Sequence, residues 1–356
     1  MPLKNSDTTH IIEEKDEYEA KRYAEYLYEA KDDIVKKYNL HEIEERLTEA
    51  LNYNLVHGEL MGLKMLLPAY KELVKQKDLK EHQLKSVHIL GWCVELMIRT
   101  FMINDDIMDK SSMRYGRSCW YTMENVGMSA VNDCIIFENL CYHLLAKHFR
   151  NTEYYVDMME MFHEVMLITS CGQCMDMVAG QRPIASFTKT AYRNLTHVKT
   201  AHCALYMPFA SAMYLAGIKN PLAFRQIKSI CLEMGYFSQA QNDVFDCFVN
   251  EKETGNIGTD IEENKLSWLA VECMLRATDD QKRIMEECYG KKDPEKVQQV
   301  IKLYNDLQLL EVYRDFEVER LKNIETQLQQ ATHEVPRKAV LEVLNRIRKR
   351  DIVKYV

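Results

Sequence analysis

The stretch SVHILGWCVELMIRTFMI, residues 86–103, is the most apolar long segment of the chain. A segment of this length can cross a membrane as a helix. It nevertheless contains His88, Glu95 and Arg99, and charged side chains are costly in lipid. We therefore expect a buried helix at the centre of a helical protein, and no membrane span.

The composition of the whole chain favours an all-α fold. Only 12 glycines and 7 prolines occur among the 356 residues, and these two residue types disfavour helices most strongly. No internal repeat or low-complexity linker divides the chain, and no boundary separates its polar motifs from its apolar segments. The sequence therefore predicts one large helical bundle.

Charge and cysteine usage limit the partners and the compartment. The formal net charge of −8 argues against a nucleic-acid partner, because phosphates require a positive surface. Eleven cysteines lie without regular spacing, and the chain starts with a polar, acidic stretch rather than a secretion signal. These features predict reduced thiols and a cytoplasmic location.

An acidic motif follows the apolar segment directly. In INDDIMDK, residues 103–110, Asp105 and Asp109 are four positions apart and share one face of a helix. Two carboxylates at about 5–6 Å repel one another unless a cation lies between them. Mg²⁺ suits this arrangement because it prefers oxygen ligands and is often shared with substrate phosphates. A solvated acidic helix end is the alternative explanation.

A second cluster ends another apolar stretch. In GYFSQAQNDVFD, residues 235–246, Asn242 and Asp246 again share a helical face. The amide oxygen of an asparagine can ligate Mg²⁺ but carries no charge. Two such clusters above an apolar cavity would bind a polyanion with a hydrophobic tail.

Seven segments, taken in order, resemble the farnesyl diphosphate synthase family of trans-prenyltransferases. They are LGWCVEL, DDIMD, RYGRSCWY, GQCMDM, VKTA, GYFSQAQNDVFDCF and GTDIEENKLSW. The resemblance implies an all-α isoprenoid synthase bundle that forms a homodimer and acts on a prenyl diphosphate. It also implies three Mg²⁺ ions, two or more of which bind with the substrate. Residues 46–356 would form the catalytic domain, and residues 1–45 would add outer helices.

The resemblance also implies roles for individual residues. Asp105, Asp109 and Lys199 match catalytic positions, while Gln173 and Asp176 match a segment near the metals. The remaining roles fall into two sets: metal ligands Asp105, Asp109, Asn242 and Asp246, and groups that hold the allylic diphosphate, Arg114, Lys199, Thr200, Gln239 and Lys265.

The chain departs from the family pattern where the second substrate, isopentenyl diphosphate, would bind. Cationic or amide residues of the family are replaced at four positions, here called the co-substrate positions: Glu59, Gly62, Ile98 and Tyr115. A hydrogen bond to a charged group contributes roughly 1.5–3 kcal/mol, so four lost bonds amount to about 6–12 kcal/mol. Such a loss would abolish useful binding of a second diphosphate.

These departures lead to a functional prediction. We interpret the chain as a class I terpene synthase, a lyase that ionises one prenyl diphosphate and rearranges the cation. It resembles insect terpene synthases derived from the farnesyl diphosphate synthase family. Thr100 and Phe101 precede the first motif, where the family places bulky residues at the cavity floor. The small Thr100 leaves room for farnesyl diphosphate and a sesquiterpene product.

Two alternatives stay open. The chain could be a trans-prenyltransferase, a farnesyl or geranyl diphosphate synthase with unusual contacts to isopentenyl diphosphate. It could also be an inactive family member that serves as a binding subunit. The substitutions at the co-substrate positions argue against the first alternative, and the retained metal and allylic motifs argue against the second.

Overall fold

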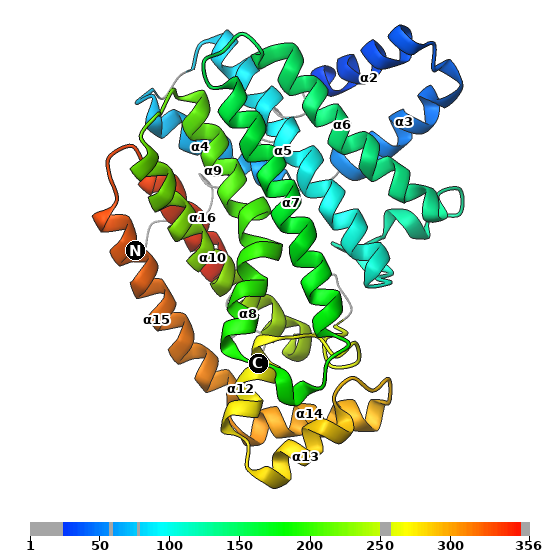
Figure 1. Ribbon diagram of the computed structural model, residues 1–356, viewed down its shortest axis with the longest axis vertical. Helices are drawn as coiled ribbons and strands as arrows, with labels where there is room; N and C mark the ends of the chain where they lie inside the picture. The colour runs from blue at the N-terminus through cyan, green and yellow to red at the C-terminus, as the bar shows by residue number, and fades with distance from the viewer. Residues whose placement is uncertain (1–23, 57–59, 77–78, 250–257, 350–356) are drawn as a thin grey trace, which may run out of the picture.

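The computed structural model describes residues 24–56, 60–76, 79–249 and 258–349. Within these residues the chain is a bundle of helices (Figure 1), which confirms the predicted all-α fold. The strands among them are β1 (Met113–Arg114) and β2 (Arg117–Ser118), which pair antiparallel in one short hairpin.

The helices follow one another with short connections. The first half of the chain contains α2 (Glu25–Tyr38), η1 (His41–Ile43), α3 (Glu44–Leu51), η2 (Asn52–Val56), α4 (Met61–Leu73), α5 (Glu81–Met108), η3 (Trp120–Thr122), η4 (Gly127–Ser129), α6 (Ala130–Phe149) and α7 (Tyr155–Ala179). The second half contains η5 (Ile184–Ser186), α8 (Lys189–Thr196), η6 (His197–Tyr206), α9 (Met207–Leu215), α10 (Pro221–Phe248), α12 (Trp268–Arg276), α13 (Asp279–Cys288), α14 (Pro294–Asp306), α15 (Leu309–Gln330) and α16 (Arg337–Lys349).

The apolar segment at 86–103 lies in α5, the central helix of the bundle. α5 packs against α4 and α9 on one side and against α6 on another, and Figure 1 shows it running between them. Its length and hydropathy would allow it to cross a membrane, yet 83% of its most apolar window is buried inside the protein. The prediction of a core helix is therefore confirmed.

Three long helices end close together. α5, α7 and α10 carry Asp109, Asp176 and Asp246 within their last turns or at the C-cap, and these acids line one cavity. The C-terminal end of a helix carries a partial negative charge. The fold therefore gathers helix ends and carboxylates of the same sign in one place.

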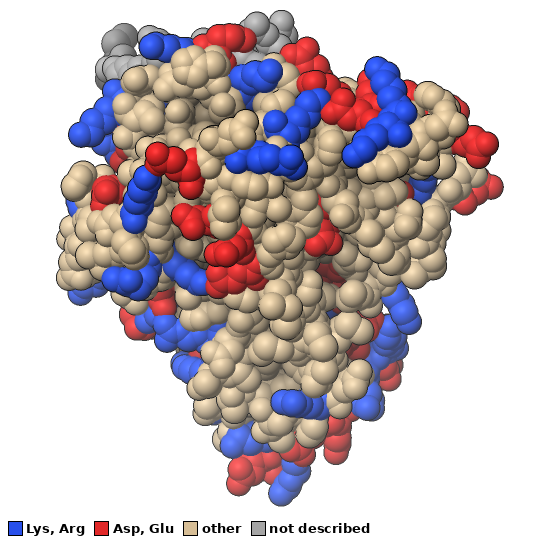
Figure 2. All heavy atoms as spheres, turned by 45° about the horizontal axis from the view of Figure 1, so that its top comes forward, with Lys and Arg blue, Asp and Glu red and all other residues tan. Residues whose placement is uncertain are grey.

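Charged side chains cover the surface unevenly. Figure 2 shows acidic and basic residues interspersed over the upper part of one face, with a broad uncharged area below them. On this face neither sign forms a continuous patch.

Glycine allows α4 to approach α5 closely. A Cβ atom at Gly62 would lie 2.3 Å from Cγ1 of Val94, which is far inside contact distance. The backbone N–H groups of Gly62 and Leu63 donate to Oε1 of Glu95 over 2.6 and 3.3 Å. Glu95 thus accepts from the first turn of α4, whose own N-cap residue, Leu60, offers no capping side chain.

Glu95 makes the stability of the protein depend on pH. Burial raises its pKa from 4.5 to about 7, although the Arg99 charge and the Gly62 bond act in the other direction. A carboxyl whose pKa is higher in the folded state stabilises the fold when it is protonated. That stability is complete below pH 4.5 and disappears as the pH rises through 7.

We predict that Glu95→Gln stabilises the protein at pH 8 and makes little difference at pH 5. The amide resembles the protonated acid, so the gain approaches about 3 kcal/mol, the value of a shift of roughly 2.5 pKa units. Denaturant unfolding at several pH values measures it. Glu286→Gln, at an exposed site on α13, is the control. Equal pH profiles for Glu95→Gln and the wild type would contradict the assignment.

Candidate active site

The residues that the sequence singled out surround one polar cavity of about 380 Å³. The structure brings together every described residue predicted to ligate metal or to hold diphosphate. These residues are Asp105, Asp109, Arg114, Lys199, Thr200, Gln239, Asn242, Asp246 and Lys265. Asp176 lines the same cavity, so the segment GQCMD also reaches it. The individual roles of these residues stay predictions.

The three acids of the first motif, Asp105, Asp106 and Asp109, have two different roles in the structure. α5 continues as a helix through Met108, so Asp105 and Asp109 face the cavity together. Asp106 is buried and accepts from Nε and Nη2 of Arg114 over 2.8 and 2.5 Å. Arg114 also donates to Asp105 over 3.0 Å. Asp106 therefore positions the arginine, and Asp105 and Asp109 are left to face the ligand.

Arg114 is held in place by the turn of the β1–β2 hairpin. Tyr115 and Gly116 form this turn, both with positive φ values of 52° and 73°. Two consecutive residues of this kind are typical of a tight type I′ hairpin. Tyr115, one of the co-substrate positions, thus has a structural task, and its exposed side chain donates towards Sδ of Met61 over 3.7 Å.

Two lysines lie between the acids of α5 and α7. Nζ of Lys199 is 2.6 Å from Asp176 and 3.0 Å from Asp105. Nζ of Lys265 is 2.9 Å from Asp176 and 2.7 Å from Asp109. Burial alone would raise the pKa of Asp105, but the charges of Lys199 and Arg114 prevail and hold it at about 2. Asp176 therefore pairs with both lysines and links them in one network of ion pairs.

The second motif contains a structural acid that the sequence did not identify. Asp243 is buried and accepts from Tyr192 Oη (2.6 Å), the backbone N–H of Trp268 (2.7 Å) and Gln239 Nε2 (2.9 Å). Gln239 in turn accepts from Thr200 over 3.0 Å. Asp243 therefore fixes the helices around the cavity by its three hydrogen bonds.

Asp246 and Asp260 also line the polar cavity. Asp246 accepts from the backbone N–H groups of Thr259 and Asp260 over 3.2 and 3.0 Å. Asp260 lines the cavity beside it and was missed by the sequence analysis, although it lies in the quoted segment GTDIEENKLSW. Only its position opposite Asp246 identifies it.

Among the residues that the structure describes, the lining of the cavity carries more negative than positive charge. It contains six aspartates, at 105, 109, 176, 243, 246 and 260, and three cations, Arg114, Lys199 and Lys265. Burial, opposed by hydrogen bonds and reinforced by neighbouring acids, raises the pKa of Asp243 and Asp246 to about 6. A further carboxylate at 242 would add to this repulsion, which gives a physical reason for Asn242.

The chemistry of the donors fits Mg²⁺. The available ligands are carboxylate and amide oxygens, and the excess negative charge requires a hard cation. Among the described residues, no three acids, histidines or cysteines converge as a ready-made metal cage; lysines lie between the acids instead. Such a site suits ions that arrive with a diphosphate and share its oxygens.

A second, apolar cavity of about 430 Å³ adjoins the polar one. Asp105, Lys199, Thr200 and Gln239 belong to both. Its apolar lining includes Ile98, Phe101, Met102, Met108, Met177, Cys203 and Ala204. A ligand with a polar head and a hydrophobic tail would fit the pair of cavities.

Thr100 does not widen this cavity as we expected. Its hydroxyl donates to the carbonyl of Leu96 over 2.9 Å and lies 3.3 Å from that of Cys134. The side chain therefore faces α6, whereas the neighbouring Phe101 lines the cavity. The sequence located the pair correctly but could not tell which member faces inwards.

The described co-substrate positions now have other tasks. Gly62 is closed in by Val94, Ile98 belongs to the apolar cavity, and Tyr115 forms the hairpin turn. Glu59 lies outside the described residues. Nearby basic residues do not replace the missing groups within the described lining of either cavity: neither Lys64 nor Arg99 belongs to it.

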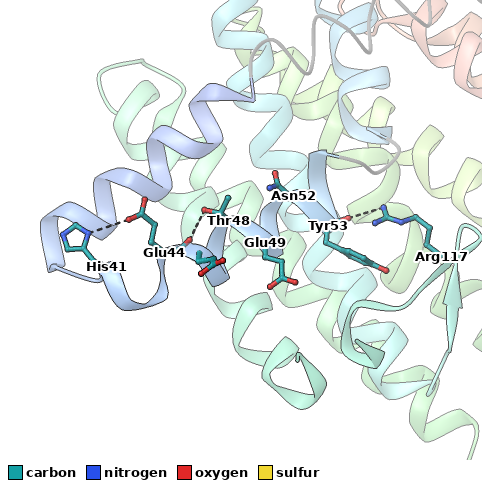
Figure 3. A pocket seen from close by; sticks show the side chains of 8 residues that line it. His41, Glu44, Thr48, Glu49, Asn52, Tyr53 and Arg117 are labelled. Carbon is teal, nitrogen blue, oxygen red and sulfur yellow. Dashed lines mark hydrogen bonds and ion pairs between the residues drawn. The ribbon is translucent and has the colours of Figure 1, made fainter. Parts of the chain in front are cut away.

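A larger hollow of about 720 Å³ lies beside α3 (Figure 3) and shares only Arg117 with the quoted segments. Two of its charged groups have partners: Glu44 pairs with His41 and Lys31, and Arg117 donates to the carbonyl of Tyr53. It is a shallow surface groove that contains none of the predicted site residues. Chemistry rather than volume therefore identifies the candidate site.

Comparisons with known proteins agree with the motifs. Residues 44–307 match the family described as polyprenyl synthetase. The farnesyl pyrophosphate synthase of Rattus norvegicus is 38% identical over 308 residues, covering 86% of this chain and 87% of the relative. The human protein of the same name is also 38% identical, over 86% of this chain and 74% of its own.

A third relative matches the chain to a similar extent. The farnesyl pyrophosphate synthase of Murgantia histrionica is 36% identical over 301 residues, covering 85% of this chain and 74% of the relative. These names favour the prenyltransferase alternative over the terpene synthase interpretation. The extent of the match and the shared motifs establish that the chain belongs to the polyprenyl synthetase family.

Proposed function

We propose that this protein binds an allylic prenyl diphosphate together with Mg²⁺ and expels the diphosphate from it. The observation that carries the proposal is the junction of the two cavities. The acids and cations of the polar cavity would hold the diphosphate, and the apolar cavity would hold the prenyl chain. Asp105, Lys199, Thr200 and Gln239 lie where the two meet, which is where the breaking C–O bond would lie.

The residues of the chain have separable tasks in this step. Asp105, Asp109, Asn242 and Asp246 would hold Mg²⁺, which stabilises the charge on the departing diphosphate. Arg114, Lys199 and Lys265 already lie among the acids and would donate to the diphosphate oxygens, which carry more charge as the bond breaks. Asp176 orients both lysines through its two ion pairs. The apolar walls exclude water from the cation.

Two reactions are open to the allylic cation, and we propose the lyase reaction as the first candidate. The described co-substrate positions offer no cationic or amide group to a second diphosphate: a Cβ at Gly62 would overlap Val94, and Ile98 and Tyr115 line the cavities instead. With no second diphosphate held nearby, the cation reacts with its own double bonds and ends by proton loss or capture of water. We keep farnesyl diphosphate as the first substrate to test, although Thr100 faces α6 and so gives no support for this chain length.

Transfer to isopentenyl diphosphate is the second candidate. The names of the relatives favour it, and every residue proposed for the ionisation step would serve it equally. The two candidates share the first bond cleavage and differ only in what reaches the cation. A cytoplasmic location, the division at residues 45 and 46, and the number of Mg²⁺ ions also stay predictions.

We predict that purified protein with Mg²⁺ converts farnesyl diphosphate to a hydrocarbon or alcohol without isopentenyl diphosphate. Gas chromatography of the products and assay of released diphosphate measure this. A product lengthened by five carbons, formed only when isopentenyl diphosphate is added, would establish the transferase instead. No release of diphosphate from dimethylallyl, geranyl, farnesyl or geranylgeranyl diphosphate, with or without isopentenyl diphosphate, would refute both.

We predict that Mg²⁺ and inorganic diphosphate together raise the melting temperature, while either alone has a small effect. At a ligand concentration 100 times the dissociation constant the gain is about 2.7 kcal/mol, or roughly 5 °C for a chain of this size. Asp109→Asn should remove most of the gain because it deletes a proposed ligand. Asp280→Asn, at an exposed site on α13, should retain it, and a full shift in Asp109→Asn would exclude that residue as a ligand.

We also propose a homodimer formed through α6 and α7. Val156, Leu167 and Val178 are 62%, 67% and 41% exposed and lie 11 residues apart, which returns to the same helical face after about three turns. Val131 and Ile135 are exposed on the neighbouring α6. An apolar face of this kind is typical of a protein contact, and a second copy supplies a matching one.

We predict that Leu167→Glu turns the dimer into a monomer, because it places two charges in the proposed interface. Size-exclusion chromatography with light scattering measures the mass. Val318→Glu on α15 is a matched control, since Val318 is also 67% exposed but lies on another helix. A monomeric wild type, or equal masses for both variants, would refute this interface.

A further inference from the structure

The segment Val198–Ala201 is enclosed on two sides by glycines. A Cβ atom at Gly172 of α7 would lie 2.5 Å from the backbone N and 2.6 Å from the Cα of Lys199. A Cβ atom at Gly235 of α10 would lie 2.4 Å from the Cβ and 2.8 Å from the Cα of Ala201. Both helices therefore approach the segment as closely as their backbones allow.

Each glycine is followed, one helical turn later, by a polar residue that contacts the same segment. Asp176, four residues after Gly172, pairs with Lys199 over 2.6 Å. Gln239, four residues after Gly235, accepts from Thr200 over 3.0 Å. Positions four apart share a helical face, so α7 and α10 each offer a backbone contact and a polar contact side by side.

The enclosed segment has an unusual backbone. Residues His197–Tyr206 form a π-helix, η6, which continues directly from α8 and into α9. π-helices are rare, and most are single-turn bulges at functional sites. A segment of this length needs support from its neighbours, and the two close approaches provide it.

From these contacts we infer that Gly172 and Gly235 are positioning residues for the active site. They set how deeply η6 lies between α7 and α10, and thereby where Lys199 and Thr200 meet the substrate. The inference rests on the proposed function for its chemical consequence, while the packing itself does not depend on it. A methyl group at either position would displace η6 by about 1 Å, the difference between these contacts and an ordinary one.

Alanine substitution tests the inference directly. Gly172→Ala and Gly235→Ala should each lower kcat/KM for diphosphate release by at least tenfold, because a displacement of about 1 Å can cost roughly 100-fold. Rates are referred to the folded fraction, so that loss of fold alone does not lower them. Gly180→Ala, at the C-cap of α7, is the control: the new Cβ would meet its nearest atom at 3.5 Å, so this variant should retain activity. Full activity in Gly172→Ala and Gly235→Ala would overturn the inference.

A second substitution separates positioning from general damage. Ala201→Gly removes the atom closest to the new methyl of Gly235→Ala, so the double variant should recover part of the lost activity and melting temperature. The same change should not rescue Gly172→Ala, whose methyl meets the backbone of Lys199. A glycine within a helix is otherwise destabilising, so an additive loss in the double variant would refute the packing argument.

The two proposals fail in different ways. If the wild type releases no diphosphate from any allylic ester, the proposed function is wrong. Calorimetric binding of Mg²⁺ with inorganic diphosphate and the rescued melting temperature then still decide whether the glycines position η6. If the wild type is active and the rescue is absent, the function stands and the positioning role is wrong.

Discussion

The arrangement of the site depends on an excess of buried negative charge. α5, α7 and α10 end together, and each contributes an aspartate at its C-terminal turn, where the helix itself is partially negative. Arg114, Lys199 and Lys265 compensate only part of this charge. Burial, and to a smaller extent the neighbouring acids, raises the pKa of Asp243 and Asp246 to about 6. A site of this kind is stabilised by divalent cations, and the cations can then hold a polyanion.

The need to compensate buried negative charge also explains the hydrogen-bond partners of the acids. Asp106 is neutralised by Arg114, Asp243 is satisfied by three hydrogen bonds, and Asp246 accepts from two backbone N–H groups. Buried carboxylates need such partners because burial without them is costly. Asn242 relieves the crowding at one position without removing an oxygen ligand. The ammonium groups of Lys199 and Lys265 are therefore placed where a diphosphate would also need them.

Close packing at three glycines shapes the surroundings of the two cavities. At Gly62 the α4 backbone lies against Val94 and Glu95, which leaves no room for the side chain that the family pattern has there. At Gly172 and Gly235 equally close contacts hold η6 against two helices. Glycine permits the approach in all three places: in the first it brings α4 against α5, and in the others it brings α7 and α10 against η6. Family membership alone does not separate these outcomes, because the relatives share the scaffold.

Local sequence patterns determined much of this protein. The run of apolar residues identified the core helix at 86–103. Helical periodicity placed Asp105 with Asp109 on one face, because that relation depends only on residues a turn apart. Ordered motifs identified the family, and every described residue that they assigned to metal or diphosphate lines the polar cavity. Tertiary structure decided the rest: that Thr100 faces α6, that Asp243 is structural, that Asp260 lies opposite Asp246, and that η6 is a π-helix. Each of these depends on how closely two distant segments approach, and that distance is set by packing and buried charge rather than by the spacing of residues along the chain.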